Sequence, residues 1–115
     1  IDKEVLEQHS EGLVITSACV GGVLGAHFVN HDYDTALKEA IWYKERFGDD
    51  FYVEVQQHFI DLDKPVLEYA PKLASELGLK MVATNDCHYI KKEHAVAHNV
   101  HLYIKDASQA NAGTL

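Results

Sequence analysis

The sequence contains few cysteines, few basic residues and no long hydrophobic run. Only two of its 115 residues are cysteine, Cys19 and Cys87, and they form no CxxC pair, which excludes a secreted disulfide scaffold. The chain has ten Lys and Arg residues and 18 Asp and Glu residues, which gives a net charge of −8. This charge argues against direct binding of duplex DNA or an anionic membrane. No apolar stretch is long enough to predict a membrane-spanning helix. These absences indicate a reducing, cytoplasmic setting.

What the sequence does contain is sufficient for a hydrophobic core. Apolar residues make up 47% of the chain, and its length predicts one domain. The sequence begins Ile-Asp-Lys with no initiator Met, so we expect it to be a piece of a longer protein.

Helical and strand patterns alternate along the sequence. Runs rich in β-branched or alternating apolar residues predict strands at 13–18, 51–58 and 80–86. In the second strand, Phe51, Val53 and Val55 alternate with Tyr52, Glu54 and Gln56. Helices are predicted at 2–9, 23–29, 32–47, 65–76 and 91–104, with Asp2 and either Asp32 or Asp34 as N-caps. The helix at 32–47 is expected to bury Ala36, Ala40, Ile41, Tyr43 and Phe47.

This alternation predicts an α/β fold with parallel strands and right-handed crossovers. Three strands are too few for a closed barrel, so the expected architecture is a partial (β/α) barrel over residues 1–106, followed by a flexible tail at 107–115. An incomplete barrel exposes strand edges and apolar faces, which predicts self-association.

Polar side chains follow each predicted strand. Cys19 comes after the first strand, Glu54 and His58 lie on or just beyond the second, and Asp86 and His88 follow the third. Because the carboxyl ends of parallel strands meet at one edge, these groups are expected on a common rim.

The Asp-x-His spacing of Asp86 and His88 is typical of a pair of metal ligands. In an extended segment both side chains point to the same side, with Cβ atoms about 6–7 Å apart. Carboxylate and imidazole suit zinc, manganese or iron, and a nearby thiolate favours zinc. Cys87 lies between them and is expected to face the opposite side. The alternative is that Asp86 caps a turn, His88 packs under Tyr89, and Cys19 is a small buried apolar residue.

His94, His98 and His101 form a stripe at i, i+4 and i+7 on the last predicted helix. The HExxH zinc motif needs Glu after its first His, whereas position 95 is Ala. The pattern therefore favours a partly exposed helical face.

Three segments together resemble a known family: "GLVITSACVGG" (12–22), "AIWYKERFGDDFYVEVQQH" (40–58) and "ELGLKMVATNDCHYIKKEHAVAHNVHLYI" (76–104). Their order and spacing are similar to the later half of the polymerase and histidinol phosphatase (PHP) domain of bacterial DNA polymerase III alpha subunits. The resemblance covers residues 3–106.

The resemblance implies a distorted seven-stranded (β/α) barrel with a metal site at its C-terminal rim. It implies that Cys19, Asp86 and His88 are metal ligands. It also implies that Glu54 and His58 orient these ligands without binding the metal themselves. The family's His-x-His ligands are absent from this sequence, as is the first half of the barrel. Divalent metal, zinc or manganese, is therefore expected to bind weakly or not at all to this chain alone.

The resemblance also implies a function in DNA replication, within a DNA-directed DNA polymerase (a nucleotidyltransferase). The PHP domain's own chemistry would be metal-dependent phosphoester hydrolysis, as an exonuclease for proofreading or in pyrophosphate removal. The implied partners are the rest of the polymerase chain and other replisome subunits, with DNA reached only through the parent protein and no membrane contact. Two alternatives are a structural or interaction module without activity and a free-standing phosphatase; "WYKERFGDDFYVEVQQH" argues against the latter.

Overall fold

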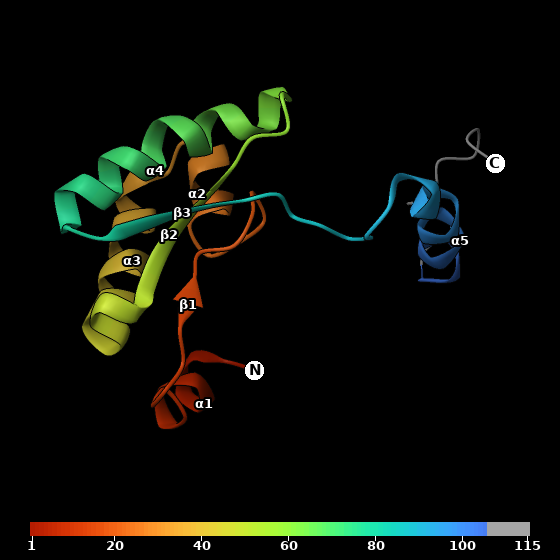
Figure 1. The fold of residues 1–115 in the computed structure, drawn as a ribbon. Helices are drawn as coiled ribbons and strands as arrows, with labels where there is room; N and C mark the ends of the chain where they lie inside the picture. The colour runs from red at the N-terminus through yellow and green to blue at the C-terminus, as the bar shows by residue number, and fades with distance from the viewer. Residues whose placement is uncertain (106–115) are drawn as a thin grey trace. The chain divides into compact units, whose positions relative to one another are not determined.

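The computed structural model describes residues 1–105, so the tail predicted at 107–115 lies outside the described residues. The described chain divides into two compact units, residues 1–85 and a second unit that begins at residue 86. The first unit contains the sheet and most of the helices, and the second contains the last helix (Figure 1).

The sheet has three parallel strands in the order β1-β2-β3: β1 (Ile15–Thr16), β2 (Phe51–Gln56) and β3 (Lys80–Thr84). This confirms the predicted partial α/β architecture. The first strand is shorter than the predicted 13–18, because its register pairs with β2 are limited to Ile15 with Phe51 and Thr16 with Tyr52. Leu13 and Val14, included in that prediction, are 41% and 63% exposed.

The helices are α1 (Lys3–Gln8), α2 (Gly25–Val29), α3 (Tyr33–Phe47), α4 (Lys64–Leu77) and α5 (Ala95–Lys105), with short 3₁₀ turns at Gly48–Asp50, Asp61–Asp63 and Lys92–His94. The Asp2 carboxylate accepts a hydrogen bond from the backbone N–H of Val5, and Asp32 accepts one from Thr35. These two aspartates are the N-caps of α1 and α3. Within residues 1–105, no helix is both long and apolar enough to cross a membrane.

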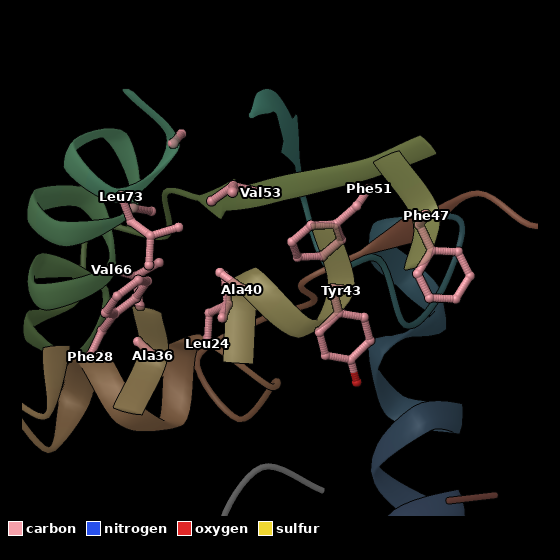
Figure 2. Packing of buried hydrophobic residues seen from close by; sticks show 12 residues of the cluster. Leu24, Phe28, Ala36, Ala40, Tyr43, Phe47, Phe51, Val53, Val66 and Leu73 are labelled. Atoms are coloured by element: carbon pink, nitrogen blue, oxygen red, sulfur yellow. The ribbon is translucent and has the colours of Figure 1, made fainter. Parts of the chain in front are cut away.

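The core joins α2, α3 and α4 to one face of β2. Phe51 and Val53, two positions apart on β2, point to this face and are fully buried. Figure 2 shows Phe51 beside Tyr43, and the two ring centroids are 5.2 Å apart. At the other end of the core, Phe28 lies near residues of α4, including Val66 (Figure 2).

One residue of the predicted helical face was assigned wrongly. Ile41 is 37% exposed, whereas Ala36, Ala40, Tyr43 and Phe47 are buried as predicted. Ile41 follows Ala40 by one residue, and a step of about 100° around the helix axis carries it off the buried stripe.

Candidate functional site

A tight turn follows β1 and carries Cys19. Ala18 adopts a left-handed backbone conformation (φ 62°), which is uncommon for a residue other than glycine. The backbone N–H of Gly22 donates to the Cys19 carbonyl oxygen at 2.8 Å, closing the turn. The thiol of Cys19 is half-buried and free.

Two glycines allow this turn to pack closely. A Cβ atom on Gly22 would lie 2.2 Å from the Ser17 carbonyl oxygen, and one on Gly25 would lie 2.3 Å from the Cys19 carbonyl oxygen. Both distances are far inside van der Waals contact, and in each case the atom approached is backbone. The backbone around Cys19 is therefore closely packed, because Gly22 and Gly25 have no side chain to hold it away from the Ser17 and Cys19 carbonyl groups.

Glu54 lies in the middle of β2, on the face opposite the helices, and joins all three strands. One carboxylate oxygen, Oε2, accepts a hydrogen bond from the Thr16 hydroxyl on β1 at 2.5 Å. The other, Oε1, accepts from the Gln56 side-chain amide at 3.0 Å and from the Thr84 hydroxyl on β3. Glu54 and Gln56 are each only 8% exposed, so both polar side chains are as shielded from solvent as residues of the apolar core.

Two opposing effects act on the pKa of Glu54. Burial raises the pKa, while hydrogen bonds from Thr16, Thr84, Gln56 and the Ala18 backbone lower it. The hydrogen bonds prevail, so the pKa lies below the usual value for glutamate. The side chain is therefore a carboxylate anion at neutral pH.

His58 follows β2 and is held by a buried aspartate. The backbone N–H of His58 donates to Asp63 Oδ2 at 2.6 Å, and the ring Nδ1 lies 3.4 Å from the same oxygen. Asp63 is 2% exposed. On the other side of the ring, Nε2 lies 3.4 Å from the carbonyl oxygen of Asn85, just after β3. His58 therefore connects the segments that follow β2 and β3.

Asp86 and His88 lie in the second unit, at its start. Their side chains form a pair with His88 Nε2 3.5 Å from Asp86 Oδ2. The expectation of an extended segment was wrong, because β3 ends at Thr84 and Asp86 has a left-handed backbone (φ 49°). Consequently the alternation that placed Cys87 on the opposite side does not apply here. Aspartate tolerates this conformation better than most residues.

His98 belongs to this second group and is partly exposed, as predicted for this helical face. Its ring centroid lies 5.6 Å from that of His88 and 5.3 Å from that of Tyr89. His94 and His101 are exposed, in agreement with the prediction for that face. His88 does not pack under Tyr89; its side chain is 61% exposed.

The structure thus gathers the predicted residues into separate groups. Glu54 and His58 brace the ends of the strands in the first unit, where Cys19 also lies, and Asp86 pairs with His88 in the second. Within either unit, the described residues form no group of three or more His, Cys, Asp and Glu side chains placed to hold a metal ion. The common metal site of Cys19, Asp86 and His88 stays a prediction.

The comparisons with known proteins identify the family. The family model of the PHP domain matches residues 1–58, half of the chain. This chain belongs to the PHP domain family. The PHP segment is also 42% identical over 100 residues to the DNA polymerase III subunit alpha of Borreliella burgdorferi, covering 87% of this chain and 9% of that protein.

Other relatives carry the same name. The DNA polymerase III subunit alpha of Campylobacter jejuni is 37% identical over 121 residues, covering 96% of this chain and 10% of the relative. That of Deinococcus radiodurans is 38% identical over 105 residues, covering 91% and 8%. The PHP segment therefore spans about a tenth of the length of the curated relatives it matches, and the predicted family is confirmed.

Several supporting residues were missed from the sequence: Thr16, Ser17, Gln56, Asp63 and Thr84. A signal for part of this set was present, because "EVQQ" places polar residues on one face of a strand that was expected inside an α/β fold. Parallel strands of such folds are usually apolar on both faces. A polar face on such a strand indicates a hydrogen-bonded network, but its partners depend on strand register.

Proposed function

We propose that this PHP segment is part of a bacterial replicative DNA polymerase and that Cys19, Asp86 and His88 contribute to a divalent metal site for phosphoester hydrolysis. The observation that carries the proposal is the similarity to several DNA polymerase III alpha subunits over 87–96% of the chain. These relatives also favour the polymerase branch over a free-standing phosphatase.

The chemistry of the three donors fits zinc, with manganese as the second candidate. Thiolate, carboxylate and imidazole are all zinc ligands, whereas manganese prefers oxygen ligands, so the Cys19 thiolate places manganese behind zinc. The His88 Nε2 and Asp86 Oδ2 atoms already lie 3.5 Å apart. The turn that carries Cys19 is closely packed, with no room for a side chain at Gly22 or Gly25. When bound, such a metal lowers the pKa of a coordinated water and stabilises the charge of a phosphate oxygen. The chain's own part is to hold the donors at the strand ends.

The proposed setting is the bacterial cytoplasm, with the rest of the polymerase chain and other replisome subunits as partners. A net charge of −8 supports contact with DNA through other parts of the parent protein rather than through this segment. The remaining metal ligands would come from the rest of the PHP domain, so binding by this chain alone is expected to be weak.

Calorimetric titration of Zn²⁺ into the chain tests the proposal. Weak but saturable heat is expected for the unmodified chain and for Asp61→Ala, whose aspartate side chain is 93% exposed and serves as a matched control. Asp86→Ala is expected to abolish that heat. Equal heats from Asp86→Ala and the unmodified chain would refute the ligand assignment.

A structural module is the second candidate, and the exposed side of β3 favours it. β3 ends the strand order, and Lys80, Met81 and Ala83 on it are exposed. An unpaired strand edge is a surface for pairing with another strand. This role predicts concentration-dependent self-association in size-exclusion chromatography with light scattering, together with no zinc heat. A monomer at all concentrations would count against it.

A further inference from the structure

We infer that Glu54 is the positioning residue of this site: it fixes the spacing between the turn that carries Cys19 and the segment that leads to Asp86. Glu54 is not itself placed as a metal ligand. The inference rests on the proposed function, because the spacing matters only if both segments serve one site.

The contacts of the carboxylate connect the two outer strands through the middle one. Thr16, which donates to Oε2, is the last residue of β1 and lies three residues before Cys19. Thr84, which donates to Oε1, is the last residue of β3 and lies two residues before Asp86. A displacement of either strand end would break one of these hydrogen bonds.

The backbone of Glu54 holds the same turn. Its N–H donates to the Ser17 hydroxyl oxygen at 2.8 Å, and Ser17 is only 3% exposed. Ser17 in turn donates its own N–H to the carbonyl oxygen of Tyr52 at 3.1 Å. Both the main chain and the side chain of Glu54 therefore fix the residues between β1 and Cys19.

A carboxylate suits this role better than the neutral or apolar alternatives. It presents two acceptor oxygens, and here they receive hydrogen bonds from three different side chains. Burying a charge is costly, and well-packed apolar residues often stabilise a fold at least as well as a buried charged group. The carboxylate adds geometric specificity, because each hydrogen bond fixes where its donor group must lie.

The reactivity of the Cys19 thiol measures, without any metal, whether Glu54 links β3 to the turn that carries Cys19. In a Cys87→Ser background Cys19 is the sole thiol, and its alkylation rate by iodoacetamide in metal-free buffer measures the environment of the turn. Thr84→Val removes a hydroxyl from β3, across β2 from Cys19. We expect this change to alter the alkylation rate by a factor of about 2 to 30, the range typical of coupling through contact networks.

Two further variants separate positioning from general stability. Val66→Ala weakens the core on the other face of the sheet and is expected to leave the rate unchanged under conditions where circular dichroism shows all variants folded. Glu54→Gln retains the shape and part of the acceptor capacity, so its rate should lie between those of the parent and Glu54→Leu. Equal rates in Thr84→Val and the parent, or equal changes in Thr84→Val and Val66→Ala, would overturn the inference.

A cobalt titration of the same proteins distinguishes this inference from the proposed function. If the parent shows no thiolate-to-cobalt absorption, the metal-site proposal fails, while the alkylation rates still decide whether Glu54 positions the turn. If the absorption is present, Thr84→Val is expected to weaken it relative to Val66→Ala. An unchanged cobalt titration in Thr84→Val would count against Glu54 as a positioning residue for the metal site.

Discussion

Gly22 shows how a single residue controls the Cys19 turn. Gly22→Ala would place a methyl group 2.2 Å from the Ser17 carbonyl oxygen, so the backbone must shift. We expect a loss of about 1–3 kcal/mol in the free energy of unfolding, the usual range for overpacking. Gly21→Ala is the matched control, since a Cβ there meets nothing within 4 Å. Urea denaturation of both variants checks this; equal stabilities would show that the turn is looser than the structure indicates.

At this scale the sequence predicted residue types better than their conformations. It singled out Cys19, His58 and Asp86 as residues that follow strands, and each does. It missed the left-handed backbone of Asp86, because an aspartate after a strand is compatible with both extended and left-handed conformations. It also missed Asp63. The contact between Asp63 and His58 depends on the 3₁₀ turn at Asp61–Asp63, which the sequence pattern did not predict.

The polar contacts between strands make the stability of the sheet depend on pH. Glu54 has a lowered pKa in the folded chain, so its stabilising contribution is present above the unfolded pKa and is lost as pH falls through the folded value. Thr16→Val removes one donor and raises the folded pKa. We expect a loss of about 1.5–3 kcal/mol at pH 7, typical of a hydrogen bond to a charged group, and a much smaller loss at low pH.

Val53→Ala provides the control for this pH dependence. Val53 is buried on the opposite face of the same strand and contacts the apolar core, so its loss of stability should be the same at both pH values. Denaturant unfolding of both variants across the acid range makes the comparison. If Thr16→Val shows the same pH dependence as Val53→Ala, the hydroxyl contributes nothing to the pKa of Glu54.

Elements were predictable where local signals agree. Asp2 is the N-cap of α1 as predicted, and Asp32, one of the two predicted candidates, is the N-cap of α3, since caps act through neighbouring residues. Gly48 and Gly78 follow α3 and α4 as their C-caps. The extent of β1 was not predictable, because pairing with β2 decides where a strand ends. The parallel pairing of the three strands followed from the alternation of helices and strands, which limits the topologies available.

The whole chain contains only part of what its proposed reaction needs. Within each unit the described residues assemble no group of three metal donors, and this PHP segment spans about a tenth of its relatives. We therefore predict that the purified 115-residue chain has no exonuclease or polymerase activity on labelled DNA with Zn²⁺, Mn²⁺ or Mg²⁺. Turnover that depends on metal, survives repeated purification and disappears in Asp86→Ala would contradict this.

The central proposal is that Cys19 and the Asp86–His88 pair serve one metal site, and cobalt absorption tests it most directly. A thiolate ligand gives cobalt a charge-transfer absorption, and the two cysteines provide an internal control. With excess Co²⁺, we predict the absorption in the unmodified chain and in Cys87→Ser, and its loss in Cys19→Ser and in Asp86→Ala. Absorption that persists in Cys19→Ser and disappears in Cys87→Ser would contradict the account.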